Sequence, residues 1–527
     1  MHTLRQKNGL SGFPKPSESP YDAFVAGHSS TSISVAAGLA RAKAIKGEPG
    51  YAIAVIGDGA FTGGMAYEAF NNAGHYKDRI IVVLNDNEMS ISKNVGAFAR
   101  YLAQIRSKPG YYSTRNRVRK AVCSIPLVGK PLAKAVSDSK SYLKEMLYHS
   151  NLFEDFGFEY VGPVNGHDLE SLCEALERAK ASEGPVLVHV DTIKGKGYGF
   201  AEQQPDAYHG VPQFNAKLGS CQNRPQDFSA VFGSWIAEAA AKDPNICAVT
   251  AAMKYGTGLE EFAERFPERF YDVGIAEAHA VTFSAGLAHG GLRPVFAVYS
   301  TFLQRAYDQV VQDLAIANEH VVLAVDRAGV VGEDGETHQG IFDISFLSAI
   351  PGMTILAPAT YPELRACLDR AMYHCSGPVA VRYPKGKEVV FPAGLHGNEK
   401  YQLSGEGDTV LISYGRLTAN CCRAAELLQK KGKSVCVLKL TQLIPYCQEL
   451  IPILRSKKAI FFVEEAQEQG SIAQMTGNLL LQHGYEGSYR IRAVPNRFLA
   501  HASVEELWEE MGWTPQAIAC WVEESVG

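Results

Sequence analysis

The sequence contains no apolar run of membrane-spanning length and no apolar core of a secretory signal near Met1. It also has no excess of one charge, because 51 Lys and Arg face 56 Asp and Glu and leave a net charge of −5. Such a balance gives no reason for attraction to nucleic acids or to a membrane surface. We therefore expect neither of these as a partner.

One segment departs from this balance, since residues 100–144 carry eleven Lys or Arg and a single acid, Asp138. Nucleic-acid binding is one interpretation of such a segment. However, it contains three prolines and no repeated motif, which favours a solvated excursion from the fold.

Paired cysteines are missing as well. The eleven cysteines are scattered singly apart from Cys421 and Cys422, and no CxxC motif occurs. An odd number of cysteines without a disulfide framework favours reduced thiols, so we expect a cytoplasmic protein.

What the sequence does contain is enough apolar material for several cores. With 527 residues, 46% hydrophobic and 20% charged, the chain is long enough for about three globular domains. The alternation of strand-like and helix-like segments predicts three consecutive α/β domains with mostly parallel sheets flanked by helices. We place their boundaries at 1–222, 223–395 and 396–527.

The most informative stretch is a βαβ unit. Residues 51–56 and 80–84 have the length and β-branched content of buried parallel strands, and residues 62–74 have the spacing of a helix. Gly57-Asp58-Gly59 follows the first strand, and Asn85-Asp86-Asn87 follows the second. Because ligands bind beyond the carboxyl ends of such strands, these groups should meet at one mouth. Their oxygens suit Mg²⁺, while the two glycines and the free N–H groups of the helix start suit a diphosphate.

A second polar cluster, Gly27-His28-Ser29-Ser30, stands directly before an Ala-rich helix predicted at 34–45. Serines at a helix start are first of all capping residues. Their small size also suits a close ligand, to which His28 can donate.

In the second domain several predicted strands end in loops that carry Arg, Asp, His or Tyr. Residues 271–275 form a short strand that leads into a helix with Glu277 at the junction. A Glu in the first helical turn is commonly only a dipole partner. The repetition of polar strand ends is nevertheless typical of an active-site face. The third domain, from about Glu399, lacks a comparable set, and we expect it to serve packing and dimerisation.

Seven segments together resemble the 1-deoxy-D-xylulose-5-phosphate synthase family of transketolase-like thiamine diphosphate enzymes. They are GHSSTSIS, GDGAFTGGMAYEA, NDNEMSIS, DVGIAEAHAVTF, YSTFLQRAYDQ, DRAGVVGEDGETHQG and VRYPKG. The resemblance implies two thiamine diphosphate-binding domains followed by a transketolase C-terminal-like domain. It also implies a homodimer.

The resemblance assigns roles to individual residues. For the metal, Mg²⁺, it implies Asp58, Asn87 and the backbone carbonyl of Met89. For thiamine diphosphate it implies Gly27, His28, Ser29, Gly59, Ala60, Asn87, Tyr198, Glu277 and Phe302. For the substrate it implies Tyr299, Arg305, Arg327, Asp334, His338 and Arg382. Glu277, His338, Asp334 and His209 would be the catalytic set.

The implied reaction condenses pyruvate with D-glyceraldehyde 3-phosphate, releases CO₂ and gives 1-deoxy-D-xylulose 5-phosphate. This product leads to isoprenoid precursors, thiamine and pyridoxal. In this picture Glu277 binds the aminopyrimidine ring from a water-poor cleft that raises its pKa. Arg327 and Arg382 clamp the phosphate, because guanidinium matches phosphate in a bidentate fashion.

The family carries a further segment before the position of Met1, including one motif with a histidine near the cofactor phosphates and another with a pocket histidine. The sequence here starts within a family-like stretch, TLRQKNGLSGFP. Three alternatives therefore stay open beside the synthase: another transketolase-like carboligase, an inactive homologue acting as a scaffold, and one part of a split enzyme.

Overall fold

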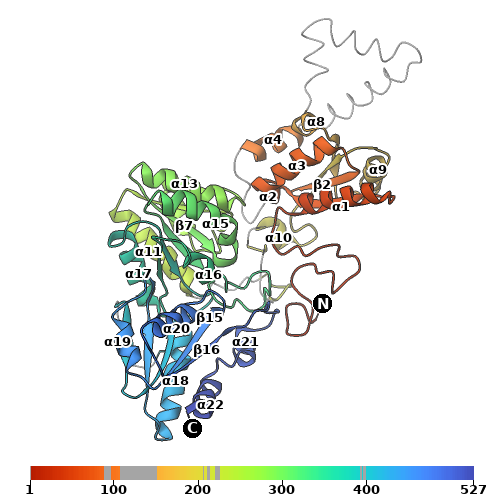
Figure 1. The fold of residues 1–527 in the computed structure, drawn as a ribbon. Helices are drawn as coiled ribbons and strands as arrows, with labels where there is room; N and C mark the ends of the chain where they lie inside the picture. The colour runs from red at the N-terminus through yellow and green to blue at the C-terminus, as the bar shows by residue number, and fades with distance from the viewer. Residues whose placement is uncertain are drawn as a thin grey trace, which may run out of the picture. The chain divides into compact units, whose positions relative to one another are not determined.

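Figure 1 shows the computed structural model of the chain. The structure describes residues 2–87, 97–106, 151–205, 207–209, 214–219, 226–391, 395 and 399–526. They form two compact units. The smaller unit comprises His28–Asn223 with Gly274–Ala276, and the larger unit comprises Met1–Gly27, Arg224–Val273 and Glu277–Gly527. Most of the basic segment 100–144 lies outside the described residues.

The smaller unit is built on a four-stranded parallel sheet in the order β1-β2-β4-β3. Its strands are β1 (Ala52–Gly57), β2 (Ile80–Asp86), β3 (Glu159–Asn165) and β4 (Val186–Asp191). Apolar residues of α1 (Ser32–Lys46) and α3 (Gly64–Tyr76) form the core on one face, and α9 (Leu169–Lys180) packs on the other. Shorter helices are α2 (Asp58–Phe61), α4 (Ala97–Arg106), α8 (Leu152–Asp155) and α10 (Gly199–Gln203).

The βαβ prediction is confirmed by β1, α3 and β2, but β1 is buried on one face only. Ala52, Ala54 and Ile56 are buried, whereas Ile53 and Val55 are 57% and 65% exposed. The strand β1 lies at the edge of the described sheet, and its side chains alternate, so that Ala52, Ala54 and Ile56 face the core formed with α1 and α3 while Ile53 and Val55 point to the opposite face.

The second sheet, in the larger unit, has seven strands in the order β14-β9-β10-β8-β7-β5-β6. All its neighbouring strands are parallel except β14 and β9. Its strands are β5 (Ile246–Thr250), β6 (Phe270–Asp272), β7 (Arg293–Tyr299), β8 (Val322–Asp326), β9 (Thr354–Leu356), β10 (Val379–Arg382) and β14 (Gln442–Ile444). The longer helices α11 (Phe228–Lys242) and α17 (Tyr361–Tyr373) cover one face, and α13 (Glu277–His289) covers the other.

Short helices follow several of these strands. They are α12 (Glu260–Arg265), α14 (Ser300–Leu303), α15 (Tyr307–Gln309) and α16 (Asp343–Leu347). A π-helical turn at Val310–Ile316 extends α15.

The third sheet has five strands in the order β11-β13-β12-β15-β16, all parallel except β11. They are β11 (Tyr401–Ser404), β12 (Thr409–Tyr414), β13 (Val435–Leu440), β15 (Ala459–Gln467) and β16 (Ser488–Val494). Helices α18 (Leu417–Lys430), α21 (Val504–Glu510) and α22 (Pro515–Val526) contribute to the core on one face. Helices α19 (Leu450–Arg455) and α20 (Ile472–Gln482) cover the other.

The second and third sheets are joined by a shared core. Val298 and Leu323 of the second sheet belong to the same buried cluster as Ile412 and Phe462 of the third. In addition, β14 comes from the third segment of the chain but pairs with β9 of the second sheet. The prediction of α/β architecture with mostly parallel sheets is thus confirmed, while the three domain boundaries stay a prediction.

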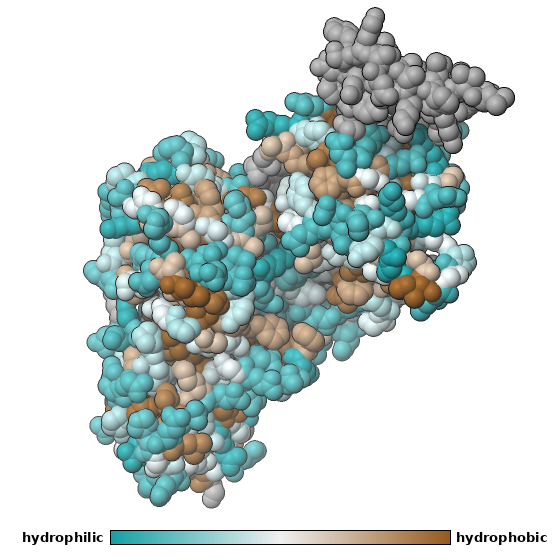
Figure 2. Space-filling view, turned by 45° about the horizontal axis from the view of Figure 1, so that its top comes forward, coloured by the Kyte–Doolittle hydropathy of each residue, from teal (hydrophilic) through white to brown (hydrophobic). Residues whose placement is uncertain are grey.

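The surface in Figure 2 is mainly hydrophilic, with apolar residues in small separate patches. Among the helices of the described residues, none combines the length and the apolar character required to span a bilayer.

Candidate functional site

In the smaller unit the two polar strand ends, Gly57-Asp58-Gly59 and Asn85-Asp86-Asn87, lie at the same edge of the sheet. Gly57 pairs with Asn85 across β1 and β2, so both strands end at the same level. Asp58 begins α2 and is only 1% exposed. Its Oδ1 accepts a hydrogen bond from the backbone of Gly59 at 2.9 Å, and its Oδ2 accepts one from the backbone of Asn87 at 3.3 Å. The structure therefore brings Asp58, Gly59 and Asn87 together.

A second carboxylate, that of Asp86, is buried beside Asp58. Burial, together with the charge of Asp86 and a hydrogen bond to it, raises the pKa of Asp58 to about 7. Two adjacent buried carboxyl groups repel each other when both are ionised, and a divalent cation relieves this repulsion. This donor set fits Mg²⁺.

Asp86 is oriented by a buried chain of hydrogen bonds. Its Oδ2 lies 2.9 Å from Nε2 of His189, and Nδ1 of that ring lies 2.8 Å from the hydroxyl of Tyr160. Sequence reasoning noted Asp86 but missed His189. The available signal was a histidine inside the otherwise apolar strand VLVHVD.

No three His, Cys, Asp or Glu side chains of the described residues gather into a metal-binding group. A metal at Asp58 would therefore take its other ligands from amide, carbonyl, phosphate or water oxygens, as Mg²⁺ commonly does. Met89, the third predicted ligand, lies outside the described residues.

The segment before α1 lies against α2. Ser30 adopts a positive φ of 71°, and its hydroxyl donates to the carbonyl of Ala60 at 2.7 Å. A Cβ on Gly63 would lie 2.6 Å from the Ser30 hydroxyl, which shows how close the two segments are. His28 and Ser29 directly precede Ser30 and therefore lie near the start of α2, which contains Asp58, Gly59 and Ala60.

Tyr198 immediately precedes α10 and belongs to an aromatic cluster. Its hydroxyl donates to the carbonyl of Ala216 at 2.8 Å, and its ring contacts the rings of Tyr208 and Phe214. His209, the predicted pocket histidine, directly follows Tyr208 and is exposed.

In the larger unit Glu277 is the first residue of α13 and is 4% exposed. Burial raises its pKa, and the charge of Arg305 opposes this shift. The guanidinium of Arg305 lies 3.5 Å from the carboxylate. Glu277 therefore has the buried environment that the sequence predicted.

Four predicted residues form a second group in the same unit. The guanidinium of Arg327 lies 3.8 Å from the ring centroid of Tyr299, at the end of β7. The ring of Phe302 on α14 stacks on Tyr299 at 5.8 Å and meets the ring of His338 edge-on at 5.4 Å. Arg327 itself has a positive φ of 59°, an unusual conformation for a side chain of this size.

The N-terminal segment contacts this group. The ring of Phe13 stacks on His338 at 4.5 Å, and Lys15 pairs with Glu336 at 3.0 Å. At the end of this segment, Gly27 packs against Thr337. A Cβ on Gly27 would lie 2.4 Å from the side chain of Thr337.

Asp334 is surrounded by positive charge. Arg5 forms an ion pair with it, and Nζ of Lys385 lies 3.1 Å from its Oδ2. Burial alone would raise the pKa of Asp334, but the charges of Lys385, Arg327 and Arg5 outweigh it and leave the pKa below its ordinary value. Asp334 is therefore ionised at neutral pH. Lys385, also missed by sequence reasoning, is the half-buried cation of the segment VRYPKG.

Arg382, the second predicted phosphate ligand, forms a buried ion pair. It is 6% exposed, and its Nε and Nη2 donate to the two carboxylate oxygens of Asp343 at 2.7 and 3.2 Å. Its bidentate face is used by Asp343 in this structure, and the role expected for Arg382 toward the phosphate stays a prediction.

The third segment is also different from the expectation, because its strands do end in charged residues. Glu464 and Glu465 of β15 are buried, as are Arg416 after β12 and Lys439 of β13. The tyrosine hydroxyl of Tyr414 donates to Glu464 at 2.8 Å. These groups were not recognised because they lie within or next to apolar runs.

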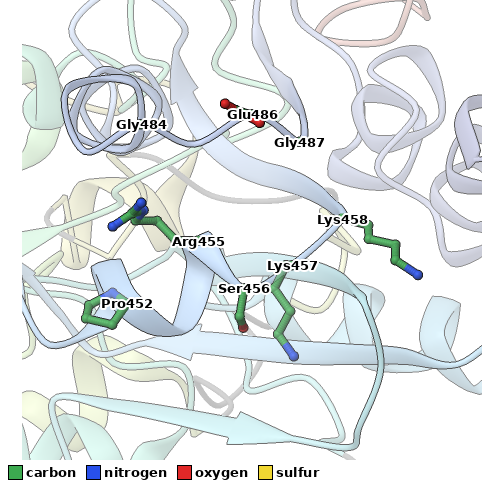
Figure 3. A pocket seen from close by; sticks show the side chains of 8 residues that line it. All are labelled: Pro452, Arg455, Ser456, Lys457, Lys458, Gly484, Glu486 and Gly487. Carbon is green, nitrogen blue, oxygen red and sulfur yellow. The ribbon is translucent and has the colours of Figure 1, made fainter.

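An open groove of about 710 Å³ on the third segment is lined by Arg455, Lys457, Lys458 and Glu486 (Figure 3). Both lysines are engaged, Lys457 with the carbonyl of Gly407 and Lys458 with Asp408. None of the predicted site residues lines this groove.

Three family models match consecutive parts of the chain. Residues 1–192 match the 1-deoxy-D-xylulose-5-phosphate synthase model, residues 224–388 the transketolase pyrimidine-binding domain, and residues 400–518 the transketolase C-terminal domain.

Among curated proteins, the chain is 46% identical to 1-deoxy-D-xylulose-5-phosphate synthase of Symbiobacterium thermophilum, with 98% of this chain and 81% of the relative covered. It is also 46% identical to the enzyme of the same name from Caldanaerobacter subterraneus, with 98% and 84% covered.

Solved structures support the fold. Transketolase from Campylobacter jejuni matches with a TM-score of 0.50 and 18% identity over 94% of this chain and 81% of its own. A split-gene transketolase described as an inactive beta4 tetramer matches with a TM-score of 0.50 and 24% identity, over 57% of this chain and 98% of its own. On the sequence matches, the chain belongs to the 1-deoxy-D-xylulose-5-phosphate synthase family.

Proposed function

We propose that the chain catalyses the condensation of pyruvate with D-glyceraldehyde 3-phosphate, with thiamine diphosphate as cofactor. The reaction forms one carbon–carbon bond, releases CO₂ and gives 1-deoxy-D-xylulose 5-phosphate, a precursor for isoprenoid, thiamine and pyridoxal synthesis. The observation that carries the proposal is the 46% identity to named synthases over 98% of the chain. The buried Asp58 and Asp86 pair supplies physical support.

In the smaller unit, we assign Asp58 and Asn87 to Mg²⁺, with Met89 as a further ligand. His28, Ser29, Gly59 and Ala60 would line the diphosphate, since small residues and backbone N–H groups permit its close approach. Tyr198 would contact the same cofactor, and His209 would reach the substrate.

In the larger unit, Glu277 would present its carboxyl group to the aminopyrimidine ring of the cofactor. Burial favours the protonated carboxyl, which can donate a proton and take it back. Phe302 would offer a ring face, and Gly27, which lies close to Thr337, would contact the cofactor through its backbone. When bound, thiamine diphosphate supplies the carbon nucleophile that attacks the pyruvate carbonyl.

For the phosphate of the acceptor we propose Arg327 and Lys385 in place of Arg382. Arg327 lies over Tyr299, and Lys385 is 39% exposed beside Asp334. Two cations near an ionised carboxylate can exchange that partner for a phosphate. His338 would hold or move a proton at its Nε2, because its Nδ1 lies 2.8 Å from the Thr337 hydroxyl. Arg305 stays assigned to the substrate region beside Glu277.

The proposal includes a homodimer and a cytoplasmic location, the latter on the pattern of cysteines. The nine cysteines among the described residues are all free. Sedimentation velocity on the purified chain tests the dimer.

The function is tested by incubating the purified chain with [2-¹³C]pyruvate and D-glyceraldehyde 3-phosphate, with and without thiamine diphosphate and Mg²⁺. We expect the labelled pentulose phosphate by NMR only when both are present. Consumption of a different aldehyde in place of glyceraldehyde 3-phosphate would favour another transketolase-like carboligase. Product formed only after addition of a second polypeptide would favour one part of a split enzyme, and no product in either case an inactive homologue.

A further inference from the structure

Arg416 lies at the carboxyl end of the third sheet, directly after β12 and before α18, and is 7% exposed. Its Nε lies 3.1 and 3.0 Å from the two carboxylate oxygens of Glu465 on the neighbouring strand β15. The indole Nε1 of Trp508 donates to Oε1 of Glu465 at 2.6 Å, and the guanidinium lies 5.3 Å from the indole ring. These contacts fix the orientation of the guanidinium.

The two terminal nitrogens of Arg416 bind outside the third sheet. Nη2 donates to the backbone carbonyl of Val330 at 2.7 Å, and Nη1 donates to the backbone carbonyl of Lys385 at 3.4 Å. Both carbonyls belong to loops that follow strands of the second sheet, β8 and β10. One buried guanidinium thus joins two loops of a neighbouring sheet.

The first of these loops, 327–340, carries Arg327, Asp334 and His338. It is closed at its base by two backbone hydrogen bonds of 2.7 and 2.8 Å between Gly329 and Gly340. Val330 is the next residue, so Arg416 binds the loop at its base. The second loop carries Lys385, whose ammonium group lies 3.1 Å from Asp334.

The backbone at the base of the first loop lies unusually close to Glu465. Gly329 has a positive φ of 84°, and a Cβ there would lie 2.4 Å from Oε2 of Glu465. A glycine in this conformation permits the approach that a side chain would prevent. The loop and the Arg416–Glu465 pair therefore form one tightly fitted arrangement.

We propose that Arg416 is a positioning residue for the phosphorylated aldehyde, because it sets the spacing of the loops that present Arg327 and Lys385. The inference rests on the proposed function, and it assigns the third domain a part in acceptor binding beyond packing. Arg416 acts through the two backbone carbonyls and does not touch the acceptor.

The test compares Arg416→Met with the control Lys439→Met. Both variants break a buried ion pair of the third sheet, but the ammonium group of Lys439 binds Glu363 and the carbonyl of Leu395 instead of the two loops. Three readouts are used: the KM values for glyceraldehyde 3-phosphate and pyruvate, the Kd of sn-glycerol 3-phosphate by calorimetry, and amide hydrogen exchange in residues 328–340.

For Arg416→Met we expect a KM for the aldehyde and a Kd for glycerol 3-phosphate that are each about tenfold higher, as for the loss of charge-assisted hydrogen bonds. The KM for pyruvate should stay within about twofold, and exchange in the loop should accelerate. Lys439→Met should lower the melting temperature without these changes. Identical behaviour of the two variants would overturn the inference.

If Arg416→Met does not fold, the same three readouts are measured on Arg416→Lys. A single ammonium group cannot bind Glu465 and both carbonyls in the geometry of the guanidinium fork. We expect an effect of about threefold in the same direction, and unchanged aldehyde KM and loop exchange would refute the proposal.

Failure of the proposed function is recognised separately, because loop exchange requires no turnover. Faster exchange in the Arg416 variants of a chain that makes no pentulose phosphate would reject the function and retain the loop contact. An active chain whose Arg416 variants keep the acceptor KM would reject the inference alone.

Discussion

The phenyl ring of Phe13 lies flat against the imidazole of His338, with 4.5 Å between the ring centroids and 8° between the ring planes. Phe302 contacts the same imidazole edge-on. Aromatic contacts of this kind contribute about 0.5–1.5 kcal/mol beyond the area that they bury. The N-terminal segment therefore has a direct part in orienting a proposed catalytic histidine.

Phe13→Ala should lower kcat/KM by about three- to tenfold, because the imidazole loses the ring that restricts its orientation. Steady-state kinetics with both substrates measures the effect. Phe24→Ala is the matched control, since Phe24 belongs to the same segment and is 56% exposed. Equal losses in the two variants would contradict an orienting role for Phe13.

Asp58→Asn should have opposite effects on ligand binding and on stability. Removing one of two adjacent buried carboxylates relieves their repulsion, so the melting temperature without ligands should rise. Mg²⁺-dependent binding of thiamine diphosphate should be lost, as measured by calorimetry. Asp78→Asn, at a partly exposed ion pair with Arg41, is the control. Cofactor affinity equal to that of the wild type would reject the metal assignment.

Glu277→Gln should leave the cofactor bound but slow the exchange of its thiazolium C2 proton at least a hundredfold. Glutamine keeps the shape of the side chain and its hydrogen-bonding capacity but cannot transfer a proton. NMR of the bound cofactor in D₂O measures the rate. Exchange as fast as in the wild type would remove Glu277 from the mechanism.

Lys385→Met and Arg382→Met should separate substrate binding from stability. Loss of Lys385 should raise the KM for glyceraldehyde 3-phosphate by about tenfold and leave that for pyruvate nearly unchanged. Loss of Arg382 leaves the buried carboxylate of Asp343 without its partner and should destabilise the fold by about 3–5 kcal/mol. Kinetics and urea unfolding measure the two effects, and the reverse pattern would restore Arg382 as the phosphate ligand.

Asp326 should make the chain less stable as the pH rises. Burial raises its pKa from 3.8 to about 7, with Arg327 opposing the shift. The folded state therefore keeps a proton that the unfolded state has released. This contribution to stability is complete below pH 4, declines up to about pH 7 and is constant above.

Asp326→Asn should remove this decline, which is on the order of 1 kcal/mol per pH unit between those limits. Urea unfolding of both proteins at pH 5, 6, 7 and 8 checks it. Parallel stability curves for the wild type and the variant would show that Asp326 does not titrate in this range.

The sequence was most informative where local pattern and chemistry coincide. Asp58 stands between two glycines after an apolar strand, and Asn87 follows the next strand, so parallel pairing alone places them at one edge. Glu277 could be placed for a similar reason, because a helix begins at that residue.

Contacts between distant segments could not be predicted in this way. Phe13 and His338 are far apart in the sequence, and no periodicity relates them. Arg382 and Lys385 lie three positions apart in one motif, but only the fold shows that Arg382 pairs with Asp343 and Lys385 with Asp334. Glu465 and Arg416 were missed because charged residues in apolar surroundings are recognised only when their partners are known.

The strand β14 has a consequence for how the larger unit can be divided. It enters the second sheet from the third segment and provides the only described backbone partner on the outer side of β9. A polypeptide ended near residue 395 would expose that sheet edge and the apolar residues of the shared core, and would be prone to aggregate. The second and third segments should therefore melt in a single cooperative transition in calorimetry, in spite of their separate sheets.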